Sequence, residues 1–397
     1  IHGFNFVDNT TLTISTKGDA PDHGTHVAGT VAAVNNNGTG VAGIAGGSGK
    51  NDGVKIMSCQ IFHDKDGGDV AMAAKAIKYA ADNGAAIIQC SYGYPAGSVT
   101  SDTAYSSGAS AEKRAIDYFI AKQNCAAIEG GLAIFAAGND LTGISGYPGA
   151  YRDYISVTAM SCDYTPAYYT NYGPGCNIAA PGGDAYQSYL ENINTGASEV
   201  LSTVNGGKYG YMQGTSMACP HVSGVAALGL SYAAKLRRHF TADEFKALLY
   251  ETATPIDDYM SGMKLYYRYV ADVGLNQPMQ LNKSNYRGQM GVGQANAAKL
   301  LNAVAGNGKQ VSFPNLYINL GGEVTAIPAN YFLGGETMTY TVSISDTTVA
   351  TASVEGRKLT VKGLRSGTTK ASITSSGNET HTFNITVRKV ANGNGWL

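Results

Sequence analysis

Apolar and polar residues in the first three hundred positions form short apolar runs separated by longer amphipathic stretches. Four apolar runs bounded by turn-forming residues predict strands buried on both faces of a parallel sheet: residues 54–62, 85–90, 132–137 and 154–159. Apolar residues at helical spacing predict helices at residues 23–34, 70–82, 112–122, 215–235, 242–252 and 294–304. Because strands and helices alternate, we expect an α/β domain with a doubly wound, mostly parallel sheet.

The pattern changes after Gly306. Five stretches of alternating apolar and polar residues predict short strands at residues 316–320, 337–345, 358–362, 370–374 and 382–387. We therefore divide the chain into an α/β domain at residues 1–306, a small all-β sandwich at residues 307–391 and a tail at residues 392–397. Two segments of the second domain, residues 345–350 and 359–364, resemble bacterial immunoglobulin-like repeats. Its role as a spacer, an adhesion module or a brace stays open.

Composition narrows the class of protein. Charged residues make up 14% of the 397 residues, below the average of about 25%, and the formal net charge is -1. Binding to nucleic acid needs basic patches, so we expect no nucleic-acid partner. No apolar run reaches the roughly 18 residues of a transmembrane helix, and the chain opens without a signal-peptide pattern. Six cysteines are too few for a disulfide scaffold, although Cys162 and Cys176 remain open as a pair.

Residues 214–221 carry the clearest chemical signal, Gly-Thr-Ser-Met-Ala-Cys-Pro-His. Gly214 permits a tight approach to a helix, and Pro220 is best tolerated in a first helical turn. Together they place Ser216 at a helix N-terminus, where unpaired N–H groups and the helix dipole favour developing negative charge. A serine there can attack a carbonyl while its own amide helps to hold the oxyanion. The alternative is an ordinary serine or threonine cap.

A serine nucleophile needs a general base, and His23 is the best placed of the seven histidines. His221 lies five residues beyond Ser216, more than one helical turn away, so it cannot easily take the serine proton. His23 stands where a loop enters a helix rich in small residues. A rival interpretation makes His23 and His26 a pair of metal ligands, but a helical His-Glu-x-x-His pattern is missing.

Three segments, residues 23–29, 136–139 and 214–221, resemble in order and spacing the histidine, oxyanion and serine motifs of subtilisin-like proteases. The resemblance covers roughly residues 1–305. It implies a serine endopeptidase that works through an acyl-enzyme, with His23 as the general base and Ser216 as the nucleophile. Asn139 would be the side-chain donor to the oxyanion. It also implies a secreted or cell-surface protein.

Two further segments resemble the substrate channel of that family. Ser91, Tyr92 and Gly93 match the segment whose backbone pairs with a polypeptide substrate as an added strand. Gly138 belongs to the oxyanion motif, and Gly146 matches the floor of the pocket for the residue before the scissile bond. Because a glycine there leaves room, we predict a preference for large apolar residues at that substrate position.

The family's metal site has a weaker counterpart. Residues 34–41, rich in Asn and Gly, resemble a loop that often wraps a structural calcium ion, which prefers six to eight oxygen ligands. The alternative that we favour is a simple Asn/Gly turn. We expect no cofactor to be required for the reaction.

One triad member is missing from the expected place. The family carries its catalytic aspartate in an Asp-Ser/Thr-Gly turn, and no such turn occurs upstream of His23. A processed N-terminal chain that stays docked could supply it, or the present sequence could omit that segment. The third explanation is an inactive homologue that acts as a protein- or glycan-binding surface module.

Overall fold

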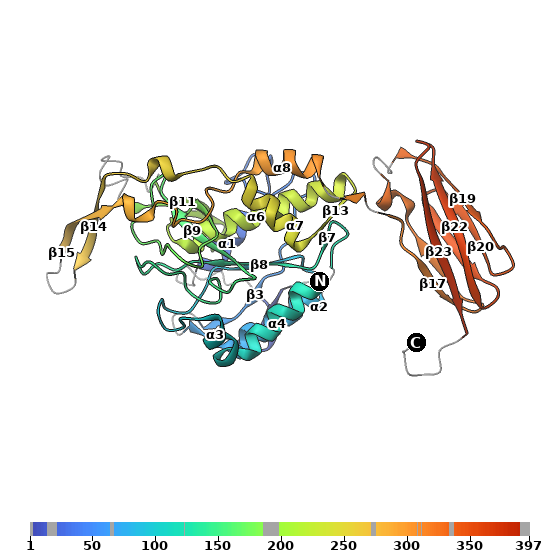
Figure 1. Ribbon diagram of the computed structural model, residues 1–397, viewed down its shortest axis with the longest axis horizontal. Helices are drawn as coiled ribbons and strands as arrows, with labels where there is room; N and C mark the ends of the chain where they lie inside the picture. The colour runs from blue at the N-terminus through green and yellow to red at the C-terminus, as the bar shows by residue number, and fades with distance from the viewer. Residues whose placement is uncertain are drawn as a thin grey trace. The chain divides into compact units, whose positions relative to one another are not determined.

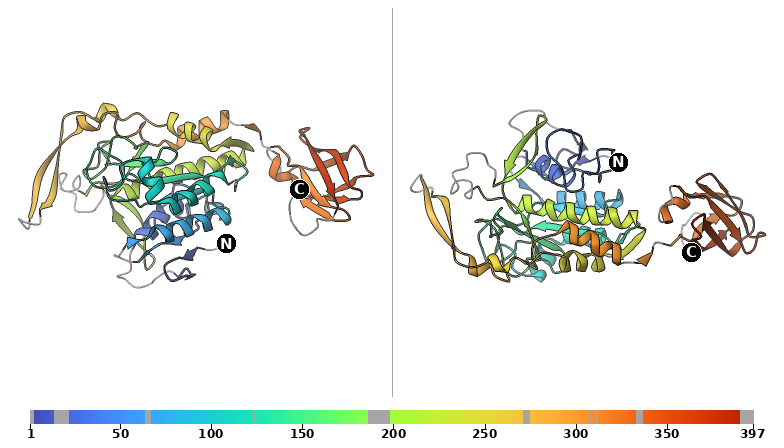
Figure 2. Two further views of the ribbon diagram at one scale, coloured as in Figure 1. Left: turned by 60° about the horizontal axis from the view of Figure 1, so that its bottom comes forward. Right: turned by 90° about the horizontal axis from the view of Figure 1, so that it is seen from above.

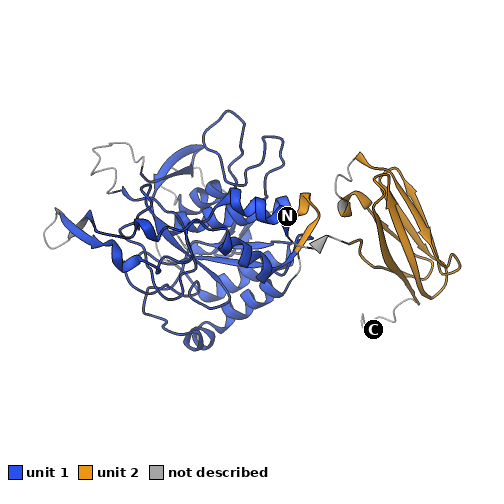
Figure 3. Cartoon of the chain, turned by 45° about the horizontal axis from the view of Figure 1, so that its top comes forward, with its two compact units in different colours: residues 1–232, 240–307 blue, residues 233–239, 308–397 orange. Residues whose placement is uncertain are grey.

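The computed structural model describes residues 3–13, 22–63, 67–122, 124–185, 198–270, 275–307, 309–310, 312–332 and 337–389. The chain divides into two compact units, shown in Figure 3. The first unit contains residues 1–232 and 240–307, and the second contains residues 233–239 and 308–397. No helix in the described ranges is long and apolar enough to cross a membrane.

A parallel sheet forms the centre of the first unit, with the strand order β10-β9-β8-β6. Its strands are β6 (Ile87–Cys90), β8 (Leu132–Ala136), β9 (Ile155–Met160) and β10 (Ile178–Pro181). Every residue of β8 and β9 is buried, which explains why their sequences are continuous apolar runs rather than alternating ones. Of these, β6, β8 and β9 lie at predicted positions, whereas β10 was not predicted.

Helices cover both faces of this sheet, as a doubly wound fold requires (Figure 1). One face carries α2 (Val70–Asp82), α3 (Asp102–Gly108) and α4 (Ser110–Ala121). The other carries α6 (Thr215–Lys235), α7 (Ala242–Glu251) and α8 (Ala297–Gly306). Ile77 of α2 and Phe119 of α4 pack with Phe135 of β8 in one core cluster. The predicted α/β architecture is therefore confirmed.

A smaller layer contains α1 (His23–Ala32), which packs beside the antiparallel hairpin of β11 (Val200–Val204) and β12 (Lys208–Met212), as Figure 2 shows. A separate sheet has the order β2-β1-β3, with β1 (Phe4–Asn5), β2 (Thr10–Thr11) and β3 (Cys59–Gln60). The remaining strands are short: β4 (Phe62–His63), β5 (Gly67–Gly68), β7 (Ile128–Glu129) and β13 (Arg238–Thr241).

One predicted strand is wrong, and one pair of strands was not predicted. Residues 54–62 do not form one buried strand, because only β3 and the start of β4 are extended there and Ile56 is 44% exposed. Residues 255–289 received no predicted strand or helix. They hold a long hairpin of β14 (Met263–Val270) and β15 (Leu275–Asn282), flanked by the short 3-10 helices η1 (Asp257–Tyr259) and η2 (Lys283–Tyr286).

The second unit is a two-layer β-sandwich. One sheet has the order β17-β23-β22-β19 and the other the order β18-β21-β20. The strands are β17 (Leu316–Asn319), β18 (Glu323–Ala326), β19 (Tyr340–Ile344), β20 (Ala350–Glu355), β21 (Lys358–Gly363), β22 (Gly367–Ser375) and β23 (Thr380–Arg388). The second unit also contains η3 (Pro328–Tyr331) and β16 (Lys309–Gln310), which pairs with Arg238 and His239 of β13 outside the two sandwich sheets. Inward residues of both sheets, such as Ile373 and Val361, share one core.

Candidate active site

Ser216 is the second residue of α6, so its N–H is among the first four of the helix, which have no carbonyl partner inside it. Pro220 lies in the second turn rather than in the predicted first turn, and it has no N–H to donate to the carbonyl of Ser216. Ser91 supplies the missing donor, because its Oγ lies 2.6 Å from Ser216 O. The helix therefore tolerates its proline, and Ser216 is tied to the segment that follows β6.

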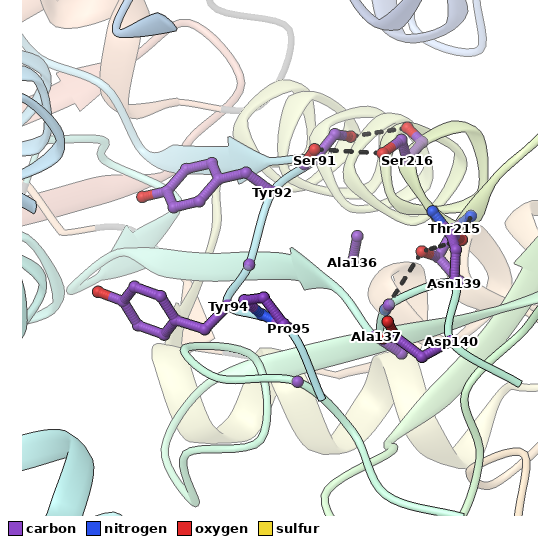
Figure 4. Close-up of a pocket in the computed structure, with 13 residues that line it drawn as sticks. Ser91, Tyr92, Tyr94, Pro95, Ala136, Ala137, Asn139, Asp140, Thr215 and Ser216 are labelled. Atoms are coloured by element: carbon purple, nitrogen blue, oxygen red, sulfur yellow. Dashed lines mark hydrogen bonds between the residues drawn. The ribbon is translucent and has the colours of Figure 1, made fainter. Parts of the chain in front are cut away.

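Asn139 follows β8 and its amide group is oriented by the start of α6. Its Oδ1 accepts from the backbone N–H of Thr215 at 2.9 Å and from the Thr215 hydroxyl at 2.8 Å (Figure 4). Nδ2 remains as a donor, and it makes no hydrogen bond with another residue of the described part of the chain. Asn139 Nδ2 and the Ser216 N–H are thus two donors at one site, the arrangement that stabilises an oxyanion.

Two glycines shape the same region. Gly138 has a φ of +107°, and a Cβ on it would lie 2.3 Å from Asn171 Nδ2, so another residue would strain the loop that carries Asn139. A Cβ on Gly146 would lie 3.0 Å from the carbonyl oxygen of Tyr94 and 3.4 Å from that of Ala137. Gly146 thus lies between two backbone segments and keeps the space between them open.

These residues line one pocket of about 270 Å³. Its walls are residues 91–95 and residues 136–140, and Gly146, Thr215 and Ser216 complete it (Figure 4). The structure therefore brings together seven of the eight residues that the sequence singled out, all except His23. The sequence reasoning did not single out the lining residues Tyr94, Pro95, Asp140 and Thr215. Each lies within two residues of a recognised site residue, which is the signal that could have found them.

His23 is the first residue of α1, and its side chain is exposed. It is not among the residues that line the pocket, and the Ser216 hydroxyl donates to Ser91 O at 3.2 Å. Reduced solvation, and secondarily the nearby His26, lower the pKa of His23 below its ordinary value of 6.5. The exposed side chain limits the size of this shift. Its direction favours the neutral imidazole at pH 7, the form that can accept a proton.

His26 has a structural role in α1. Its buried ring places Nε2 2.9 Å from Val200 O and 3.1 Å from Gly210 O. Because both partners only accept, Nε2 carries the proton and donates to the β11–β12 hairpin. The other ring nitrogen, Nδ1, is buried and has no hydrogen-bond partner among the described residues. Within the described ranges, no group of three or more His, Cys, Asp or Glu side chains could hold a metal ion.

The loop at residues 34–41 supports the interpretation as a turn. Asn36 has a φ of +56°, and Asn37 Oδ1 accepts from the Thr39 N–H at 3.0 Å. An asparagine oxygen used in this way closes a local turn. Asn35 Oδ1 is buried without a hydrogen-bond partner among the described residues.

The thiol of Cys176 is free, so the bridge left open with Cys162 does not form here.

On this doubly wound sheet, the Ser216 hydroxyl lies at a helix N-terminus together with two N–H donors, an arrangement suited to acyl transfer in α/β enzymes. The model of the subtilase family matches residues 2–277, more than half of the chain. The chain belongs to the subtilase family. A thermophilic serine proteinase of Bacillus sp. (strain AK1) is 32% identical over 269 residues, covering 68% of this chain and 54% of that protein. Thermitase of Thermoactinomyces vulgaris is 32% identical over 228 residues, covering 57% and 66%.

The chain thus spans between about half and two thirds of the length of these two relatives. Among solved structures, proteases from Pseudoalteromonas arctica PAMC 21717 align with a TM-score of 0.53 and 27% identity, covering 77% of this chain and 84% of that one. A lanthipeptide protease aligns with a TM-score of 0.54 over 76% of this chain and 81% of its own, at 22% identity. The second likeness shows the fold alone.

Proposed function

We propose that this protein is a serine endopeptidase that hydrolyses peptide bonds through an acyl-enzyme. Ser216 is the nucleophile, His23 the general base and Asn139 the side-chain donor to the oxyanion. The observation that carries the proposal is the pair of donors at one pocket, the Ser216 N–H and Asn139 Nδ2, next to the Ser216 hydroxyl. Such donors stabilise the negative charge that develops when the hydroxyl attacks a carbonyl.

The proton of Ser216 follows the usual path of a serine protease. In the structure the Ser216 hydroxyl donates to Ser91 O, so it has to turn toward His23 for attack. Neutral His23 accepts the proton from Oγ and later gives it to the leaving amine. A water molecule then attacks the carbonyl of the acyl-enzyme while His23 accepts its proton. His23 gives that proton to Ser216 Oγ, and the carboxylic acid product leaves.

A carboxylate that orients His23 comes, in this proposal, from polypeptide upstream of Ile1, either joined to the chain or processed and still docked. The strand order supports an added strand from this upstream polypeptide, because β3 and β6 each lie at an edge of their sheets in the described part of the chain. A strand added to such an edge gains main-chain hydrogen bonds. The carboxylate would hold one tautomer of His23 and stabilise its protonated form.

The substrate in this proposal is an extended polypeptide that pairs with residues 91–93, with a large apolar side chain in the pocket bounded by Gly146. Related proteins include an extracellular halolysin-like serine protease of Natrialba magadii. We therefore place the site of action outside the cytoplasm. A small substrate residue before the scissile bond would leave the pocket underfilled. An acidic residue there would bring a carboxylate into the pocket without a partner for its charge.

Labelling with a serine-directed phosphonate tests the proposal. The intact protein should gain one phosphonyl group on Ser216, detected by mass spectrometry, and Ser216→Ala should gain none. An intact preparation that does not react, under conditions that label a known subtilase, would overturn the enzyme proposal. It would favour an inactive homologue that acts as a protein- or glycan-binding module.

A further inference from the structure

Behind the pocket wall lies a buried carboxylate that the proposed reaction does not use. Glu112, in the first turn of α4, is 1% exposed. Its Oε1 accepts from the Tyr92 hydroxyl at 3.1 Å, and its Oε2 accepts from the hydroxyls of Tyr94 at 2.8 Å and Tyr105 at 3.1 Å. Within the described ranges, Glu112 forms no ion pair with a lysine, arginine or histidine.

Such a group is costly unless its oxygens are hydrogen-bonded, and an apolar residue in the same place is often equally stable or more so. An ionised carboxylate only accepts, so all three tyrosine hydroxyls must point toward it. Hydrogen bonds to a charged acceptor are also stronger than neutral ones. Glu112 therefore holds three large side chains in one arrangement.

Two of these tyrosines belong to the pocket wall. Tyr92 and Tyr94 line the pocket, while their rings extend away from Ser216 (Figure 4). The Tyr94 N–H donates to Tyr147 O at 2.7 Å, one residue beyond Gly146. Because the Tyr94 carbonyl also lies 3.0 Å from the Cβ position of Gly146, a shift of Tyr94 would change the width of the pocket directly.

We propose that Glu112 is a positioning residue that sets the width of the pocket beside Ser216 by holding Tyr92 and Tyr94 from behind. It thereby selects for large side chains before the scissile bond. The inference rests on the proposed function, because it assigns this pocket to the substrate residue that precedes the bond to be cut. Glu112 itself does not line the pocket and acts through the two tyrosines.

Tyr105 provides a matched control. It lies in α3, is fully buried and donates to the same oxygen as Tyr94, but it does not line the pocket. Its ring packs against Tyr147 at 5.4 Å between centroids. Replacing either tyrosine by phenylalanine removes one hydroxyl from the same carboxylate and leaves the ring in place. Only the Tyr94 change loosens the wall.

Protonation of Glu112 should loosen the pocket wall, as the loss of the Tyr94 hydroxyl does. The titratable groups that face it are the three bonded tyrosines, together with Tyr154 and Cys90, whose pKa values are raised partly by its charge. Burial raises the pKa of Glu112, and the three tyrosine hydrogen bonds partly oppose this. A protonated carboxyl is itself a donor, so one tyrosine loses its acceptor and the wall loosens.

The test measures binding and cleavage of two peptides that differ only in having Phe or Ala before the scissile bond. Binding is measured in the full chain with Ser216→Ala, so that no peptide is cut. We expect Tyr94→Phe and Glu112→Gln to weaken binding of the Phe peptide by about tenfold, the scale of one hydrogen bond to a charged group, with a much smaller effect on the Ala peptide. In the active chain, KM should rise while kcat changes little. Tyr105→Phe should change neither the binding of the Phe peptide nor the KM.

Equal losses in Tyr94→Phe and Tyr105→Phe, or an unchanged preference for Phe in both Tyr94→Phe and Glu112→Gln, would overturn the inference. If Glu112→Gln fails to fold, the two tyrosine variants still decide. A protein that binds the Phe peptide but never cleaves it would overturn the proposed reaction, while the binding comparison still tests Glu112. A wild-type chain that binds neither peptide would overturn both.

Discussion

The serine side and the histidine side of the proposed catalytic site are built very differently. Ser216 and Asn139 are tied by hydrogen bonds to Ser91 and Thr215, at the end of a fully buried sheet. His23 is exposed at the start of α1. The contacts of that helix with β11 involve His26, whose Nε2 donates to Val200 O and whose carbonyl accepts from the Ser202 hydroxyl. The described part of the chain therefore orients the proposed oxyanion donors through side-chain hydrogen bonds. It holds the proposed general base, His23, through the backbone of α1.

The largest expected effect comes from removing the general base. His23→Ala should lower kcat by about 10⁶-fold, the scale known for subtilisin, because Ser216 then has no proton acceptor. Steady-state hydrolysis of the Phe peptide measures this. Ser216→Ala and the double variant should be equally inactive, since the two residues act as a unit. Additive losses in the double variant would show that His23 and Ser216 do not act together.

On the serine side, Asn139→Leu should lower kcat by about 10² to 10³-fold and leave KM nearly unchanged, because its Nδ2 binds oxygen only as charge develops. Thr215→Val is the matched control. It removes the hydroxyl that donates to Asn139 Oδ1 and accepts from the Gly138 N–H at 3.2 Å, and it keeps the backbone N–H bond to Asn139. Its loss should be smaller. A KM effect as large as the kcat effect in Asn139→Leu would argue against an oxyanion role.

The structural tie between Ser91 and Ser216 predicts a stability effect. Ser91→Ala leaves the carbonyl of Ser216 without its donor, because Pro220 cannot provide one. We expect the free energy of unfolding to fall by about 1–3 kcal/mol in denaturant titrations. In the background of Pro220→Ala, which restores a helical N–H, the same Ser91→Ala change should cost less. Equal losses in the two backgrounds would contradict this account of the helix start.

The smallest expected effect is the pH dependence of the free energy of unfolding. Loss of solvation lowers the pKa of buried His26 and of half-buried His221 below 6.5, so the folded state binds fewer protons there than the unfolded chain. The free energy of unfolding should therefore fall as the pH drops through the window below 6.5. Glu112, whose pKa burial raises, works in the opposite direction above 4.5.

Denaturant unfolding between pH 7 and pH 5 measures this balance. Glu112→Gln removes the opposing contribution, so its acid loss should be steeper than that of the wild-type chain. The rate constant kcat/KM should also fall on acidification, because His23 must be neutral to accept a proton. A kcat/KM that stays constant between pH 7 and pH 5 would contradict the role of His23 as the general base.

Much of the fold was predictable because local signals agreed with the tertiary structure. The bounds of α2 and α6 match their predictions, and β8 and β9 lie where continuous apolar runs place them. The hairpin of β14 and β15 was missed for a physical reason. Lys264 faces inward there, bonded to Asp184 and to oxygens of residues 161–166, so a buried charge breaks the apolar alternation that marks a strand.

The sequence alone determined the parts of the site that depend on neighbours in the chain. The segment at residues 214–221 correctly placed Ser216 at a helix N-terminus, because backbone geometry acts locally, although Pro220 lies one turn later than predicted. How distant segments meet depends on the tertiary structure. It brings Thr215 to Asn139, Ser91 to Ser216 O, and Glu112 to the tyrosines of the pocket wall. Those contacts join residues that the chain separates, so no local pattern announces them.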